Sequence, residues 1–167
     1  MDKIVIIAKS QATEADLKSA RLGSRFGRLD LQSQLALLAV ELLGVDFGKF
    51  SRDRIAICLA AKAGSLSTDF DFWQGRDAIG GPSPTLFAYT LPSAAIGEIA
   101  IRHRLTGPNL CFVGGNEIIL TEATDLIRRG EADACVCVYC EVILSAAAKM
   151  IRAAPTANAS AFFLTLS

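Results

Sequence analysis

The stretch that decides the fold is GPNLCFVGGNEIILTEATDLIRRGEADACVCVYCE, residues 107–141. It opens with a short apolar segment at 109–113, and the Gly-Gly-Asn at 114–116 allows a sharp turn because glycine tolerates backbone angles that other residues avoid. Residues 117–129 have a helical pattern that ends in two arginines and a glycine, and residues 132–139 are again apolar. The pattern predicts a strand, a tight elbow, a helix and a second strand.

The elbow carries an asparagine where many enzymes place a nucleophile. Such an elbow points one side chain off the top of a sheet, but the amide of Asn116 cannot attack an ester or a thioester. Asparagine is also among the best helix N-caps. Asn116 is therefore either a replaced active-site residue or a helix cap, and the residue type favours the cap. The segment lacks both G-x-G-x-x-G and a P-loop lysine, so it does not predict nucleotide binding.

Composition limits the function classes. The 167 residues fit one domain, 1–167, with 51% apolar and 20% charged residues and a formal net charge of zero. A neutral chain offers no electrostatic footprint for nucleic acid or an anionic membrane, and no apolar run is long enough to span a bilayer. The N-terminus is too short and too acidic for a signal peptide and indicates a first strand. We expect a cytoplasmic protein.

Along the whole chain, strand patterns alternate with helix patterns. Strands are expected at 4–8, 54–60, 109–113, 132–139 and 160–166. Between them lie a leucine-spaced helix capped by Asp30, a helix from Pro92 to His103 with small residues, the elbow helix and a further helix near 142–150. Residues 64–84 are expected to form a long loop, which in a compact domain is usually functional. This order predicts an α/β layered fold with a largely parallel sheet.

These residues, in this order, resemble the N-terminal half of a β-ketoacyl synthase of the thiolase-like superfamily. The resemblance covers most of the chain and is sharpest over residues 82–141. It is carried by PTLF at 84–87, LPSAAIGEIA at 91–100, Gly-Pro at 107–108, IRRGEADA at 127–134 and the strand at 161–166. The resemblance implies a thiolase-like half, a β-α-β-α-β-α-β-β layered mixed sheet with a buried elbow helix.

Two departures from the family bear on activity. The family's nucleophilic cysteine falls nine residues after the glycine of Gly-Pro, and that position is Asn116. The family's catalytic histidines belong to the C-terminal half, which the resemblance does not cover. No catalytic residue is therefore carried over. The resemblance implies a non-catalytic ketosynthase-like subunit in fatty acid or polyketide biosynthesis, a pseudoenzyme similar to the chain-length factors, which keep the fold, replace the cysteine and shape the acyl tunnel.

The resemblance also implies partners and candidate contacts. Expected partners are a second copy or an active ketosynthase, and an acyl carrier protein; no cofactor is implied. The substrate-binding candidates are Phe87, Gly114, Gly115 and Asn116. Two alternatives stay open. The chain can be a diverged acyltransferase or condensing enzyme that uses another cysteine, such as Cys111, or completes its site with a partner chain. It can also be a degenerate remnant with a structural or binding role.

The cysteines and the single histidine favour structural interpretations. All five cysteines lie in or beside apolar runs, which indicates buried thiols in a reducing compartment. Cys135, Cys137 and Cys140 lack a fourth ligand and a paired CxxC knuckle, so no metal is expected. His103, between Arg102 and Arg104 at a helix end, indicates a solvated positive cluster rather than a catalytic base.

Arginines and aromatic residues leave two interpretations each. The arginines are either solvated or meet an acidic carrier protein: Arg21, Arg25, Arg28, Arg102 and Arg104. The aromatic residues line an acyl tunnel, grip a partner or fill the core: Phe70, Phe72, Trp73 and Phe87.

The elbow helix predicts association. Its apolar residues cover more than one narrow stripe: Ile118, Ile119, Leu120, Ala123, Leu126 and Ile127. A helix that is apolar on most sides is normally packed against other elements on most sides. One half-fold alone would then expose a large apolar surface, which monomers avoid. An area of several hundred Å² represents roughly 10 kcal/mol of gross drive towards association. In the family the strand at 109–113 also pairs across a dimer two-fold, so it is a candidate edge.

Overall fold

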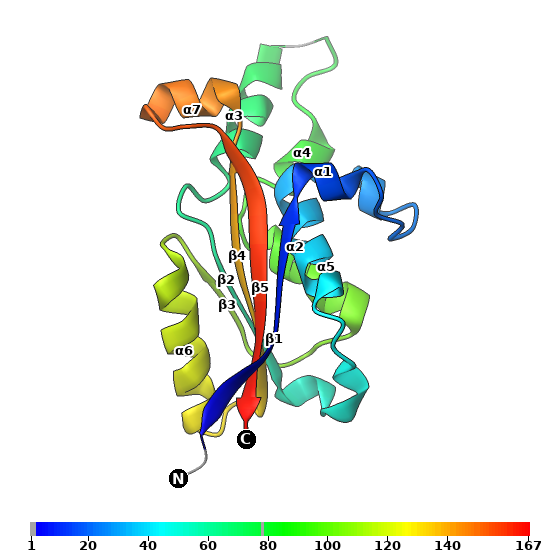
Figure 1. Cartoon of the computed structure of the whole chain (residues 1–167). Coiled ribbons are helices and arrows are strands. Elements are labelled where there is room, and N and C mark those ends of the chain that lie inside the picture. Colours follow the sequence, from blue (N-terminus) through cyan, green and yellow to red (C-terminus); the bar gives the residue numbers. More distant parts are fainter. Residues whose placement is uncertain (1–2, 78) are drawn as a thin grey trace.

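The computed structural model describes residues 3–77 and 79–167, in which strands and helices alternate (Figure 1). The elements are β1 (Ile4–Thr13), α1 (Glu14–Leu17), α2 (Leu31–Leu42), β2 (Ile55–Ala60), α3 (Leu66–Gln74), α4 (Pro84–Phe87), α5 (Ala94–His103), β3 (Asn109–Phe112), α6 (Asn116–Arg128), β4 (Ala134–Ile143), α7 (Ser145–Ile151) and β5 (Thr156–Leu166). Short 3-10 turns lie at η1 (Phe26–Arg28), η2 (Phe47–Lys49), η3 (Arg52–Arg54) and η4 (Gly75–Asp77). Within these ranges, no helix is both long and apolar enough to cross a membrane.

The five strands form one mixed sheet in the order β1-β5-β4-β2-β3. β2 runs parallel to β3 and β4, whereas β5 is antiparallel to both β4 and β1. Every residue of β2 is buried, because helices cover both faces of the sheet centre. This is why β2 and β4 read as continuous apolar runs instead of alternating ones. The predicted α/β layered fold with a mixed sheet is confirmed.

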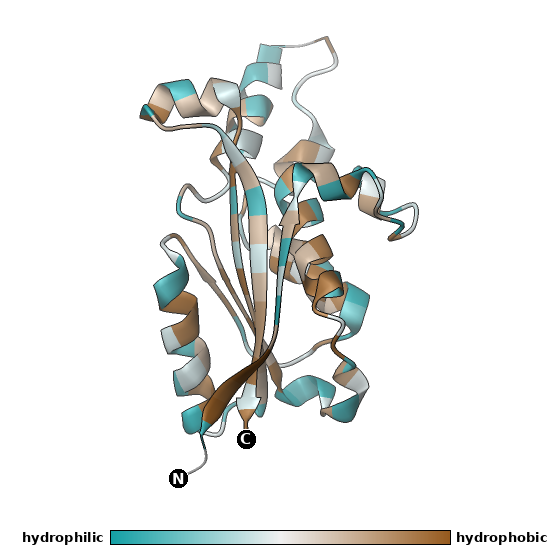
Figure 2. Ribbon diagram, viewed as in Figure 1, coloured by the Kyte–Doolittle hydropathy of each residue, from teal (hydrophilic) through white to brown (hydrophobic). Residues whose placement is uncertain are grey.

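Helices α2 and α5 cover one face of the sheet, and α6 covers the other (Figure 1). The larger core, between the sheet and α2 with α5, includes Leu35, Ile57 and Phe163. The smaller core lies beneath α6 and includes Cys58 and Ile119. Figure 2 shows apolar residues in each of these helices; in α2 they run around the helix, because residues 35–40 are all buried. As predicted, α2 begins behind an N-cap at Asp30, whose carboxylate accepts a bond from the Ser33 N–H.

The elbow helix α6 buries one side only. Its apolar side chains are buried or half-buried under the sheet, whereas its exposed residues are polar: Asn116, Glu117, Thr121 and Arg128. No large apolar side chain of α6 is exposed. The prediction that α6 would present an unpaired apolar surface is therefore wrong. The buried residues Ile119, Ala123, Leu126 and Ile127 recur at spacings of three and four, so they form one face, and the half-buried Ile118 and Leu120 flank it.

The predicted long loop at 64–84 is also wrong in part, because α3 occupies its first half. Two serines hold this helix in place. The Ser67 hydroxyl donates to the Val142 carbonyl and accepts from the Leu144 N–H, which ties α3 to the end of β4. The Ser65 hydroxyl donates to the Thr90 carbonyl over 2.7 Å, which ties the start of α3 to the segment after α4. Serine and aspartate have low helix propensity, so the helix depends on these tertiary bonds.

Candidate functional site

The elbow lies at the carboxyl edge of the parallel strands, where α/β folds place their ligands. Two backbone bonds hold it to the end of β2. The Ala61 N–H donates to the Phe112 carbonyl over 3.1 Å, and the Gly114 N–H donates back to the Ala61 carbonyl over 3.3 Å. The turn from β3 into α6 is therefore fixed against the central strand.

Asn116 is the first helical residue of α6, and Gly115 occupies the cap position. No side-chain cap bond is made, and the Asn116 side chain is exposed. The prediction that Asn116 caps the helix is therefore wrong by one residue. Gly115 has the extended backbone of a cap residue but no side chain to accept the free N–H groups.

Neither elbow glycine adopts a left-handed backbone, so turning freedom does not explain them. A Cβ at Gly115 would meet only the carboxylate of Glu117, the end of a flexible side chain that folds back over the start of α6 and can rotate aside. A negative charge in the first turn is stabilised by the partial positive charge of the helix N-terminus. Glu117 therefore places a carboxylate at the elbow, beside Gly115 and Asn116.

A buried carboxylate, Glu141, holds the loop after β2 from beneath. It accepts bonds from the Lys62 N–H over 2.7 Å and the Ala63 N–H over 3.0 Å. The Tyr139 hydroxyl donates to the same carboxylate over 3.2 Å. Burial raises the pKa of Tyr139, and the charge on Glu141 raises this pKa further, so the hydroxyl remains a donor. The only sequence signal for Glu141 was an acidic residue in an apolar strand.

Phe87 lies apart from the elbow residues. It is on α4, 63% exposed, with its ring 5.5 Å from that of Phe72. Among the described residues, no hydrogen bond or ring contact joins Phe87 to residues 114–116. The structure therefore brings Gly114, Gly115 and Asn116 together at the elbow and places Phe87 on a separate helix.

Four of the five cysteines are buried, as predicted, but Cys111 is exposed. The Sγ atoms of Cys135 and Cys137 lie 3.8 Å apart beneath α6, and hydrogen bonding to the Cys137 thiol, with burial, raises the pKa of Cys135. Cys111 is exposed because β3 is an edge strand with an alternating burial pattern. The expectation that its side chain points into packing is wrong.

Cys111 lacks the surroundings of an activated nucleophile. Partial burial raises its pKa, and no neighbouring base or positive charge lowers it. Reactive cysteines instead lie in electropositive surroundings that favour the thiolate. The open position of Cys111 thus makes it reachable but not activated.

We expect iodoacetamide to modify the folded protein at Cys111 first, and more slowly than it modifies free cysteine at pH 7. The four buried thiols should react only after unfolding, and Cys111→Ser should abolish the first adduct. Mass spectrometry of the intact protein follows each addition. Saturable modification of Cys111 by an acyl thioester, faster than that of free cysteine, would contradict this and favour the condensing-enzyme alternative.

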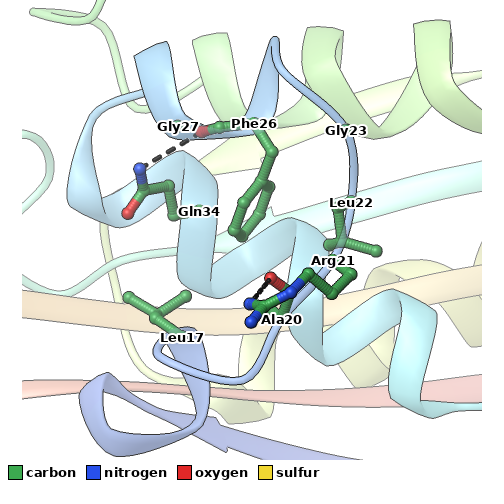
Figure 3. A pocket seen from close by; sticks show the side chains of 8 residues that line it. All are labelled: Leu17, Ala20, Arg21, Leu22, Gly23, Phe26, Gly27 and Gln34. Carbon is green, nitrogen blue, oxygen red and sulfur yellow. Dashed lines mark hydrogen bonds between the residues drawn. The ribbon is translucent and has the colours of Figure 1, made fainter.

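The arginines are partly paired and partly open. Arg25 makes a two-pronged ion pair with Glu98 on α5, and Arg102 bonds Glu41 on α2 over 2.8 Å. Arg21 instead donates to the carbonyls of Lys18 and Ala20. It lines an open cavity of about 570 Å³ whose apolar lining includes Leu17, Leu22 and Phe26 (Figure 3).

No family model and no curated protein matches this chain. Its fold is that of ketosynthases and chain length factors, as the resemblance implied. The ishigamide ketosynthase/chain length factor aligns with a TM-score of 0.78 at 20% identity, covering 97% of this chain and 62% of that one. A ketosynthase in complex with its chain length factor from Xenorhabdus doucetiae aligns with a TM-score of 0.75 at 17% identity, covering 98% of this chain and 79% of that one. A structure of a type II polyketide synthase acyl-carrier protein in complex with its ketosynthase, bound to the hexaketide, aligns with a TM-score of 0.80 at 15% identity. The alignment covers 99% of this chain and 63% of that one.

This chain thus spans about three fifths of two of these structures. At such identities the likeness concerns the fold.

Proposed function

We propose that this chain is a non-catalytic ketosynthase-like subunit that pairs with an active β-ketoacyl synthase and helps to shape its acyl site. The observation that carries the proposal is Asn116 at the first turn of α6, in a fold shared with ketosynthases and chain length factors. An amide cannot form the acyl thioester on which condensation depends. The Glu117 carboxylate beside it adds a negative charge where the reaction would generate one.

The edge of the sheet at β3 supports a partner surface. β3 pairs only with β2, so its outer backbone groups are open to a further strand. Beside it, Val113 is 72% exposed and Leu91 is 63% exposed. Val113 and Pro92 both lie within van der Waals distance of the space above Gly64, so these apolar residues belong to one region. A ketosynthase chain that adds its own edge strand would cover them.

The basic segment before α2 supports docking of an acidic acyl carrier protein. Lys18, Arg21 and Arg28 carry three positive charges, and no ion pair to them is formed among the described residues. Surface cations without an ion-pair partner attract an acidic protein and raise its association rate. The role in fatty acid or polyketide biosynthesis and the cytoplasmic location stay predictions.

We expect a full-length ketosynthase from the same genome to co-purify with this chain when the two are expressed together. Val113→Asp should weaken retention at least about tenfold, because it places a charge at the apolar edge. The matched control, Leu42→Asp, changes an exposed leucine on α2 and should retain the partner fully. Quantitative pull-down measures both.

Light scattering of the chain alone distinguishes the remaining outcomes. A homodimer without ketosynthase binding contradicts the proposed subunit role and favours the remnant with a binding role. A monomer at low micromolar concentration that captures no ketosynthase contradicts both partner proposals.

A further inference from the structure

A second cavity lies at the opposite end of the sheet from the elbow. It opens where β2 begins, after η3, and where α5 ends at His103. Its volume is about 400 Å³, and its lining includes Arg52, Arg102 and Arg104 together with His103. Three arginines and the only histidine of the chain thus converge on one open hollow.

The arginines keep donors available for a ligand. Arg52 uses Nη1 to bond the His103 carbonyl over 2.9 Å, and Arg102 uses Nε for Glu41 and a long 3.4 Å bond for Leu22. The Arg104 side chain makes no hydrogen bond among the described residues; the residue ends α5 in a left-handed backbone and is exposed. Each guanidinium has five N–H groups, so most of these donors remain uncommitted.

His103 lies beneath the hollow and is largely covered. Its side chain is only 14% exposed, and its Nε2 atom is buried, 3.6 Å from the nearest carboxylate oxygen, on Glu41. The ring packs edge-on against Phe47 at 4.9 Å, which holds its orientation. The imidazole is therefore close enough to respond to a charge bound in the hollow, whereas the arginines supply the donors.

Two carboxylates near the cavity do not cancel its charge. Asp46 lines the hollow but accepts the Gly48 N–H over 2.9 Å, and Glu41 is bonded to Arg102. Three guanidiniums against two engaged carboxylates leave a positive balance before His103 is counted. Positive charge, together with planar guanidinium donors that converge on one hollow, suits the binding of tetrahedral oxyanions.

We propose that this hollow binds a tetrahedral oxyanion, such as the phosphate group of a small ligand, with Arg52 and Arg104 as its main donors and His103 at its floor. The site is distant in the fold from the elbow, and it does not depend on the proposed function.

The single histidine makes the test direct. We would titrate the protein with inorganic phosphate at constant ionic strength, set with sodium chloride, and follow the His103 ring signals by NMR. A saturable shift with a millimolar dissociation constant is expected, with no shift of the Trp73 indole. Arg104→Gln should weaken binding about fivefold or more, because one charged donor is lost. Constant ionic strength removes general screening as a cause.

Arg152→Gln is the matched control. Arg152 ends α7 in the same left-handed backbone as Arg104 ends α5, and it is also exposed. This variant should bind phosphate as the unchanged protein does. A linear shift that chloride reproduces, or equal weakening by both variants, overturns the proposal and indicates general charge attraction only.

A pH series with sulfate gives a second readout, since sulfate keeps its charge over the range. In the free protein burial lowers the pKa of His103; Arg102 and Arg52 also lower it, and Glu41 opposes them. A bound anion favours the protonated ring, so sulfate should bind more tightly as pH falls. From pH 7.5 to pH 6 the expected gain is about twofold for a rise of half a unit in the pKa of His103. Affinity independent of pH would remove His103 from the site.

Discussion

Glu141→Leu is expected to lower the free energy of unfolding by about 3 kcal/mol or more. The substitution leaves the N–H groups of Lys62 and Ala63 without their acceptor, and an unsatisfied buried group costs about 1–3 kcal/mol. It also removes the acceptor of the Tyr139 hydroxyl. Leucine is close to glutamate in size, so a cavity does not explain the loss. Urea unfolding followed by circular dichroism measures the change.

Two further variants separate the bonds at this position. Glu141→Gln keeps one carbonyl acceptor and should cost less, about 1–2 kcal/mol, whereas Tyr139→Phe removes a single bond and should cost about 1 kcal/mol. An unfolding midpoint for Glu141→Leu equal to that of the unchanged protein would show that water satisfies the loop as well as the carboxylate does.

Gly107→Ala should destabilise the protein by about 2–3 kcal/mol. A Cβ at this position would lie 2.7 Å from the carbonyl carbon of Ile55 and 3.1 Å from the carbonyl oxygen of Asp53. Both are backbone atoms, so they cannot rotate aside. Relief requires Pro108 to move, yet its carbonyl accepts the Ile57 N–H over 2.8 Å at the start of the β2–β3 pair.

Gly97→Ala is the control for this substitution. Gly97 lies inside α5, and a Cβ there meets nothing within 4 Å. Alanine should therefore stabilise the protein by about 0.5–1 kcal/mol through its better helix propensity. The same glycine-to-alanine change should therefore lower the urea unfolding midpoint at Gly107 and raise it at Gly97. Gly107→Ala within 0.5 kcal/mol of the unchanged protein, by the scale of neutral substitutions, would contradict the steric role.

Much of the fold was accessible from the sequence because its signals are local. The apolar runs of β2 and β4, the Asp30 cap and the elbow pattern each depend on residues close together in the chain. The Gly-Pro at 107–108 was recognised from its resemblance, and the structure adds the physical reason, close contact with the backbone of Ile55.

The rest depends on contacts between distant segments. Glu141 meets a loop 78 and 79 residues earlier, which only the strand order brings near. The exposure of Cys111 follows from the edge position of β3, and a strand pattern does not reveal its place in a sheet. The predicted cap at Asn116 is one residue too late, because Gly115 also has an extended backbone and precedes the first helical residue.

The open side of β3 sets a rule of stoichiometry for any assembly built on it. One strand edge accepts one added strand, so a second copy and a ketosynthase chain would compete for the open edge of β3. Relative abundance in the cell, together with the difference in affinity, then decides which pair forms. In the proposed assembly, the rate at which the cell makes this chain therefore sets the ratio of mixed to self-paired forms.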